Sequence, residues 1–297
     1  MSKPPVIARV ESIRRQRTLA RRADVAGFGF WSSKDVVFSF RPAEDDSGVR
    51  FFRSDLPKAE PIPALVYYRI AKPRQTSLAL GNAQVDMVEH ALAALKGAGI
   101  DNCDIVVDAP EAPGMDGSGA PFFDAFLEAG IVEQKREKPR LKVVVEGEFI
   151  DESSTNGAKI VARPREDGQT VFRYDLRYDV PGAIPNQTAT FVWNRNPLDF
   201  RREIATCRTF LSYEEATYLR EQGICERVGT KDVLVFGKDG PIDNSPRFDN
   251  ECARHKILDM IGDFSLTSFD LEGEFWATKT GHQQNAKALL RALENIA

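Results

Sequence analysis

The chain has 297 residues, of which 42% are hydrophobic and 28% are charged, so it is long enough to bury the cores of two ordinary domains. A formal net charge of -4 and a pI of about 5.6 argue against nucleic acid as the main partner. No stretch approaches the roughly 20 apolar residues of a membrane span, and the N-terminus lacks the apolar core of a signal peptide, so we expect a cytoplasmic protein.

Short strands and two helices are expected in the first half of the chain. Alternating apolar runs at 35–41 and 49–53 predict strands, because glycine, proline and serine break them at both ends. Apolar residues at helical spacing predict helices over 86–97 and 122–129, each followed by glycine, with a buried strand at 105–107 between them. A local cluster of arginines is expected to form a solvated strand or turn: Arg14, Arg15, Arg17, Arg21 and Arg22.

The second half repeats this order of strands and helices. The charged stretch at 133–140 has nothing to bury and is predicted to link the halves. A helix at 213–222 is expected within an insert around 211–231. The other predicted elements are strands at 141–149, 159–162, 170–176 and 188–193, a helix over 255–264, a strand at 273–277 and a final helix over 284–296.

These elements predict an α+β fold with two domains of similar topology. Each domain is expected to be a mainly antiparallel sheet with helices on one face. The predicted domains are 1–134, which carries Glu89 and His90, and 135–297, which carries His255, Asp259 and His282. We expect a metal between them.

His255 and Asp259 are the basis for expecting that metal. Four residues apart on a helix, an imidazole and a carboxylate share one face and can bind one zinc ion (Zn²⁺). His90 from the other half would meet them at the interface, and His282 follows a Lys-Thr-Gly run. Zinc held by two histidines and one carboxylate keeps a position open for water. No Cys-x-x-Cys occurs, so a thiolate zinc site is not indicated.

Each of these residues also has an ordinary structural interpretation. A histidine on a helix is often a hydrogen-bonded core residue, and His-x-x-x-Asp pairs arise by chance. Glu89 can be a helix N-terminal acid that the helix dipole stabilises, and Asp263 can be a surface residue. By default, Lys256 and Lys279 are solvated. The combination of several such residues favours the metal site.

Five runs in fixed order carry a resemblance to a known family: 88–102 (VEHALAALKGAGIDN), 108–122 (DAPEAPGMDGSGAPF), 208–210 (RTF), 255–263 (HKILDMIGD) and 279–282 (KTGH). Together they resemble the UDP-3-O-acyl-N-acetylglucosamine deacetylases, zinc enzymes of lipid A synthesis. The resemblance extends from about Ser12 to Leu293. It implies that the helices of the two domains are sandwiched between the two sheets.

The resemblance also implies roles for individual residues. His90, His255 and Asp259 would hold zinc. Glu89 would be the general base on water, and His282, paired with Asp263, would protonate the departing amine. The implied oxyanion donor is Thr209, and the implied substrate contacts are Lys256 and Lys279 with the sugar and diphosphate, and Phe210 with the sugar and acyl chain.

The resemblance implies a UDP-sugar substrate and hydrolysis of its N-acetyl group, with release of acetate. We expect a monomer. Peripheral contact with a membrane through the acyl chain stays open.

The chain departs from the family pattern near the expected substrate. Trp31 takes the position of a histidine in a glycine-rich loop, Ser33 replaces a glycine, and Met87 replaces a threonine. Glu226 and Arg227 fall where the family has apolar residues and glycine along an acyl passage, and charge is costly there. We therefore expect short or absent 3-O-acyl groups, or an acyl chain that leaves over Trp31.

Three functions remain open at this point. The first is deacetylation of UDP-3-O-acyl-N-acetylglucosamine, because every metal and acid/base position is kept. The second is a paralogous deacetylase acting on a different N-acetylated sugar or nucleotide-sugar, which Trp31, Glu226 and Arg227 favour. The third, a non-catalytic binding protein of the same fold, would be favoured by loss of Glu89, Asp259 or His282.

Overall fold

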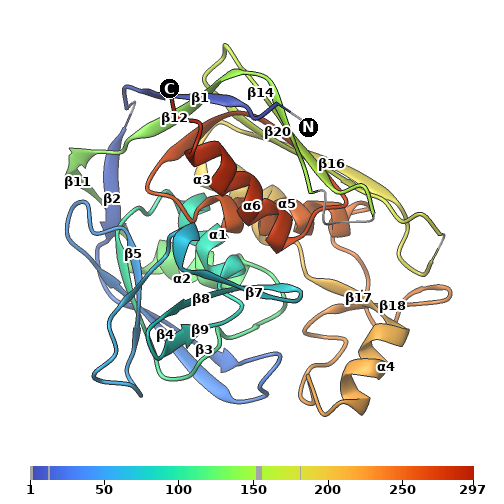
Figure 1. Cartoon of the computed structure of the whole chain (residues 1–297). Helices are drawn as coiled ribbons and strands as arrows, with labels where there is room; N and C mark the ends of the chain where they lie inside the picture. Colours follow the sequence, from blue (N-terminus) through green and yellow to red (C-terminus); the bar gives the residue numbers. More distant parts are fainter. Residues whose placement is uncertain (1–2, 13, 152–155, 181) are drawn as a thin grey trace.

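Two sheets enclose a layer of helices in the computed structural model of the chain, which describes residues 3–12, 14–151, 156–180 and 182–297 (Figure 1). Within these residues the larger sheet runs β1-β12-β20-β14-β13, and β15 and β16 continue it from β20. The smaller sheet runs β3-β4-β10-β5-β6. Most strand pairs in both sheets are antiparallel. The predicted α+β class, with helices sandwiched between sheets, is confirmed.

The described residues of the first half of the chain build the smaller sheet, a two-stranded sheet of β2 and β11, a three-stranded sheet of β7, β8 and β9, and three helices, and they add β1 to the larger sheet. Its strands are β1 (Val6–Val10), β2 (Arg15–Leu19), β3 (Ala23–Phe28), β4 (Asp35–Pro42), β5 (Val49–Arg53), β6 (Ile62–Pro63), β7 (Arg69–Lys72), β8 (Gln75–Leu80), β9 (Ala83–Val85), β10 (Cys103–Val107) and β11 (Ile131–Glu137). Its helices are the short η1 (Val66–Tyr68), α1 (Glu89–Ala98) and α2 (Ala120–Ala129).

The second half builds most of the larger sheet, an insert and the remaining helices. Its strands are β12 (Arg140–Val145), β13 (Gly147–Ile150), β14 (Lys159–Arg163), β15 (Thr170–Leu176), β16 (Gln187–Trp193), β17 (Phe210–Ser212), β18 (Leu234–Gly237), β19 (Gly240–Pro241) and β20 (Asp270–Thr278). Its helices are α3 (Pro197–Phe200), η2 (Arg201–Ala205), α4 (Tyr213–Glu221), α5 (Glu251–Phe264) and α6 (His282–Leu293).

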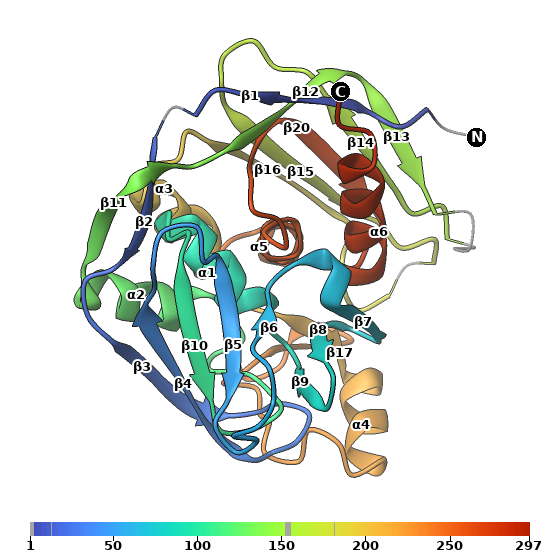
Figure 2. The same ribbon diagram turned by 60° about the vertical axis from the view of Figure 1, so that its left-hand side comes forward.

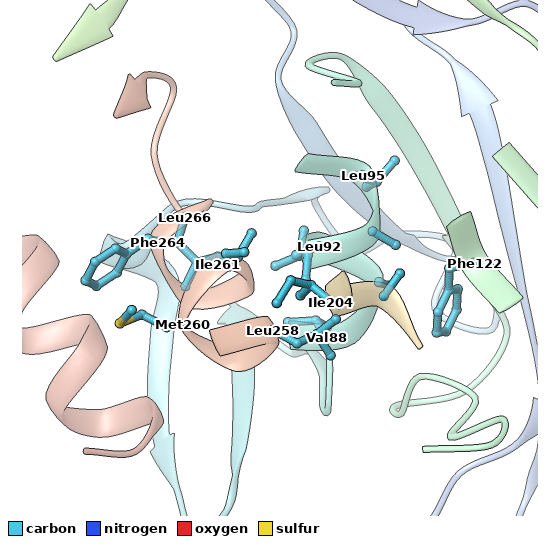
Figure 3. Packing of buried hydrophobic residues seen from close by; sticks show 14 of the residues in the cluster. Val88, Leu92, Leu95, Phe122, Ile204, Leu258, Met260, Ile261, Phe264 and Leu266 are labelled. Atoms are coloured by element: carbon cyan, nitrogen blue, oxygen red, sulfur yellow. The ribbon is translucent and has the colours of Figure 1, made fainter. Parts of the chain in front are cut away.

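Helices α1 and α5 cross at the centre of the molecule, and their apolar faces meet there (Figure 3). Val88 and Leu92 belong to the α1 side of this core, and Leu258 and Ile261 to the α5 side. The backbones come so close that a Cβ atom on Gly262 would overlap the carbonyl oxygen of Glu89. Only glycine permits this approach.

The insert stands apart from the two sheets. Helix α4 lies with strands β17 and β18 below the large sheet, beside the β7 ribbon (Figures 1 and 2). Ser212 caps α4 by accepting a hydrogen bond from the backbone N–H of Glu215, and the Glu215 carboxylate accepts one in return from the N–H of Ser212. No residue of α4 is fully buried. Its local cap stabilises this helix, because core packing contributes little.

The structure moves some of the expected boundaries. The helix predicted over 86–97 begins only at Glu89, since Met87 has a φ of 56° and cannot be helical. Most of the predicted linker at 133–140 is strand β11, which pairs with β2. The chain passes into the large sheet at Arg140. The division into domains at 134/135 stays a prediction.

Arg14 differs most from its expected solvated setting. Its guanidinium bonds Asp101, at 2.6 Å, and Asp270, at 2.8 Å, and its side chain is only 15% exposed. Lys96 also pairs with Asp270, at 2.7 Å, and Lys138 with Asp101, at 3.1 Å. Asp101 follows α1, whereas Asp270 begins β20, so this buried cluster ties the helix layer to the large sheet. Sequence spacing gives no sign of it.

The cluster makes stability sensitive to acid. Burial would raise the pKa of both Asp101 and Asp270, but the facing lysines and Arg14 outweigh it and hold both below the ordinary 3.8. A depressed folded-state pKa stabilises the protein above the unfolded pKa, and this stability is lost as pH falls. We therefore expect the free energy of unfolding to drop steeply below about pH 4.

The cluster can be tested with Asp270→Asn. This change leaves buried cations without their partner and should lower the free energy of unfolding by about 3–5 kcal/mol at neutral pH. It should also flatten the loss of stability below about pH 4, measured by denaturant titration. Asp24→Asn is the control, because the Arg22–Asp24 pair is exposed and worth less than about 1 kcal/mol. An Asp270→Asn protein as stable as this control would contradict the argument.

Candidate active site

His90, His255 and Asp259 converge where α1 crosses α5. Their ligand atoms lie within 4.8 Å of one another, and all three side chains are buried. Oδ1 of Asp259 is 3.3 Å from Nε2 of His255 and 3.7 Å from Nε2 of His90. The two imidazole rings stand nearly perpendicular, at 82°. Residues far apart in the sequence thus direct two nitrogens and one oxygen at a single point.

The surroundings of these three residues fit a divalent metal. Oδ1 of Asp259 is buried and has no hydrogen-bond partner among the described residues, which is unusual for a carboxylate. Its other oxygen accepts a hydrogen bond from Lys256 at 2.7 Å. Nδ1 of His255 lies 3.0 Å from the carbonyl oxygen of Cys207, so Nε2 is the nitrogen turned toward Asp259.

The protonation states of His255 and Asp259 also suit them to bind a metal ion. Burial lowers the pKa of His255, although the neighbouring Asp259 opposes this shift. The lowered pKa keeps the imidazole neutral. Burial would raise the pKa of Asp259, but Lys256, His255 and His282 hold it well below its usual range. A neutral imidazole and an ionised carboxylate are the forms that bind metal.

Glu89 lies beside this point, at the first position of α1. Its Oε2 accepts a hydrogen bond from the backbone N–H of Thr76 at 2.9 Å, and its Oε1 is 3.8 Å from Nε2 of His282. Burial raises the pKa of Glu89, against the effect of the nearby histidines. A carboxylate with a raised pKa is suited to taking and returning a proton.

His282 and Asp263 form a buried pair. Nδ1 of His282 is 3.0 Å from Oδ2 of Asp263, so Nε2 points toward Glu89. Burial disfavours the imidazolium, but the carboxylates of Asp263, Glu89 and Asp259 outweigh it and raise the pKa of His282 to about 9. His282 also begins α6, two residues before the predicted start at Gln284, so the carboxylates override the unfavourable helix terminus.

Two residues that the sequence did not single out hold Asp263 in place. Asn285 donates a hydrogen bond to Oδ2 of Asp263 at 2.8 Å, and the Thr76 hydroxyl donates to Oδ1. Asn285 lies one helical turn after His282, and that spacing was a usable signal. Thr76 comes from strand β8, and only the tertiary structure reveals its contact.

A cavity of about 1080 Å³ opens over this constellation. It is lined by every candidate site residue of the sequence except Asp263, which lies behind His282: Trp31, Glu89, His90, Thr209, Phe210, His255, Lys256, Asp259, Lys279 and His282. The Phe210 ring stands edge-on to His255, with centroids 6.1 Å apart. A buried ion pair between Arg208 and Glu251 fixes the chain just before Thr209.

One wall of this cavity is apolar, and the expected charges are missing from it. The wall is formed around a cluster that includes Phe30, Met87, Val233, Val235, Leu211 and Ile242, with Trp31 at its edge. Glu226 and Arg227 are exposed and do not line the cavity. Arg227 instead donates to the carbonyl of Ser33, pairs with Asp35 at 2.6 Å and covers the Phe28 ring. The structure thus places the charges of Glu226 and Arg227 outside this cavity.

Two imidazoles and a carboxylate around one point, with a buried acid and a further imidazole beside them, are an arrangement typical of metal-dependent hydrolases. Comparison with known proteins identifies the family. The chain belongs to the UDP-3-O-acyl N-acetylglycosamine deacetylase family, whose model matches residues 16–295.

Individual relatives cover nearly all of the chain. It is 34% identical over 284 residues to the UDP-3-O-acyl-N-acetylglucosamine deacetylase of Chlamydia felis, covering 95% of this chain and 98% of that protein. With the enzyme of the same name from an Anaeromyxobacter species it shares 36% identity over 277 residues, or 93% of this chain and 87% of that one. It is also 31% identical to the bifunctional enzyme LpxC/FabZ of Chlorobaculum tepidum, where the match covers 92% of this chain and 62% of that enzyme.

No helix in the described part of the chain is both long enough and apolar enough to cross a membrane.

Proposed function

We propose that this protein hydrolyses the N-acetyl group of UDP-3-O-acyl-N-acetylglucosamine, releasing acetate and the free amine. The observation that carries the proposal is the buried set of Glu89 and His282 beside the three converging residues His90, His255 and Asp259. The shared family supports the substrate. Acetate release from the acylated UDP-sugar by the purified protein tests it directly.

His90, His255 and Asp259 would hold zinc, because two imidazoles and a carboxylate are a common catalytic zinc set. When bound, zinc supplies Lewis acidity, which lowers the pKa of water and polarises an amide carbonyl. Lys256 holds the second oxygen of Asp259, so the carboxylate offers Oδ1 to the metal.

The protein's own residues then move the protons. Glu89 takes a proton from the attacking water, and burial suits it to this task by raising its pKa. The Thr209 hydroxyl donates a hydrogen bond to the oxygen that gains negative charge. His282 delivers its Nε2 proton to the departing amine, while Asp263 holds Nδ1. The bond between carbonyl carbon and nitrogen breaks as acetate and amine separate.

Different walls of the cavity bind different parts of the substrate: polar residues bind the sugar and diphosphate, and the apolar wall binds the acyl chain. Lys256 and Lys279 lie on the polar side and contact the sugar and the diphosphate. Phe210 lies against His255 and packs on the sugar. The apolar wall beside Trp31 receives the 3-O-acyl chain. The paralogous function loses its main support, because Glu226 and Arg227 stay outside. The monomeric state, peripheral membrane contact and cytoplasmic location stay predictions.

Zinc binding is the first prediction from this assignment. The protein should bind one zinc per chain, and His90→Ala and Asp259→Ala should each lower the affinity by at least about tenfold, since each removes a direct ligand. Metal analysis after dialysis measures this, with Glu226→Leu as an exposed control. Full zinc occupancy in both ligand variants would place the metal elsewhere.

The acid and the base can be separated from metal binding. Glu89→Gln and His282→Ala should each lower kcat by roughly 100- to 10,000-fold, the usual contribution of a positioned proton-transfer group. Zinc content should stay near wild type, because neither residue is assigned as a ligand. Steady-state kinetics with metal analysis on the same samples checks both points. Turnover within a few-fold of wild type for Glu89→Gln would remove it as the base.

The apolar wall predicts the response to acyl length. Each buried methylene is worth about 0.8 kcal/mol, so kcat/KM should rise by up to about fourfold per added methylene until the wall is filled. Val235→Asp should flatten this rise by placing a charge in the wall, whereas Glu226→Leu should leave it unchanged. A series of UDP-sugars differing only in acyl length measures the slope. Equal kcat/KM for short and long chains would refute acyl binding at this wall.

A further inference from the structure

Charged groups around the cavity are paired with one another. Five of the lining cations have carboxylate partners: Lys72 with Asp86, Arg74 with Glu215, Arg177 with Asp175, Lys256 with Asp259 and Lys279 with Asp179. The exposed fractions of these carboxylate side chains differ widely: 14% for Asp86, 41% for Glu215, 11% for Asp175, 5% for Asp259 and 73% for Asp179. Asp179 is therefore the carboxylate that water solvates most easily when its ion pair breaks.

Lys279 is held in the cavity wall, three residues before His282. Its backbone adopts a φ of 55°, and its N–H donates to the carbonyl oxygen of Asp175. The next carbonyl, that of Thr280, accepts a hydrogen bond from the buried hydroxyl of Tyr174. The Lys279 side chain is only 18% exposed. The backbone of Lys279 is therefore fixed at the cavity wall, and its side chain lies largely buried there.

Asp179, in contrast to Lys279, is largely exposed to solvent. It follows β15, and its side chain projects largely into solvent apart from the contact with Lys279. Exposed ion pairs contribute little, because water solvates the separated carboxylate almost as well. The poorly hydrated ammonium of Lys279, in contrast, requires an anion. A ligand with more negative charge than one carboxylate can thus displace Asp179 at small cost.

We propose that Asp179 is a specificity-determining residue that competes with the diphosphate of the substrate for the ammonium of Lys279. This proposal rests on the function proposed above, in which the substrate is a UDP-sugar. A diphosphate offers several charged oxygens and displaces the single carboxylate. An N-acetylated sugar without phosphate leaves the Lys279–Asp179 pair intact and gains nothing from Lys279. Asp179 thereby lowers the affinity of Lys279 for every anionic ligand, so that only a highly charged ligand such as a diphosphate displaces it.

UDP itself is the probe, and its dissociation constant is measured by calorimetry on the zinc-loaded protein. Asp179→Asn should bind UDP about two- to fivefold more tightly than wild type, because the competing carboxylate is gone. Lys279→Met should bind about tenfold or more weakly. In the Lys279→Met background, Asp179→Asn should lose most of its gain, since the two residues act as a unit. With the full substrate, Asp179→Asn should lower KM and leave kcat unchanged.

Asp167→Asn is the matched control. It removes the same charge from an exposed aspartate paired with Arg165, away from the cavity, and should leave UDP affinity unchanged. Either of two results with the variants overturns the proposal: UDP binding by Asp179→Asn that is no tighter than wild type, or an equal gain with and without Lys279. If wild type releases acetate but binds no UDP, the competition proposal fails alone. If it releases no acetate, the proposed function fails.

Discussion

The close approach of α1 and α5 at Gly262 is the constraint on which the site depends. Because no Cβ separates the α5 backbone from the carbonyl of Glu89, the first turn of α1 lies directly on α5. Glu89 and His90 therefore face the side of α5 that carries His255, Asp259 and Asp263. Apolar side chains between the two helices, among them Leu92 and Ile261, hold this crossing together (Figure 3).

Burying so many charged groups where α1 crosses α5 costs desolvation free energy, and hydrogen bonds and ion pairs among these groups offset it. Glu89, Asp259 and Asp263 are almost fully buried, and each accepts a hydrogen bond from a neighbouring element or residue. The exception is Oδ1 of Asp259, which faces two imidazole nitrogens and has no other partner in the described chain. The same network that stabilises the carboxylates thus leaves one oxygen for a metal and raises the pKa of His282.

The insert shows how one segment can be polar outside and apolar inside. Arg227 anchors the loop after α4 to the β3–β4 turn through Ser33 and Asp35, and it covers the Phe28 ring. The Arg227 charge is paired with Asp35 at the surface, and the cavity wall is left to apolar residues such as Val233 and Val235. A charged residue can therefore be close in sequence to the residues of an apolar wall without lying in that wall.

Helical spacing and motif order were sufficient to predict the fold class, the main helices and the set of converging residues. The reason is that i and i+4 positions share a helix face regardless of context, as His255 and Asp259 do. The sequence did not predict the contact of Thr76 with Asp263, the burial of Arg14 between Asp101 and Asp270, or the outward turn of Arg227. Those positions depend on partners 87 to 256 residues away along the chain or on the path of a loop, and only the packed tertiary structure decides them.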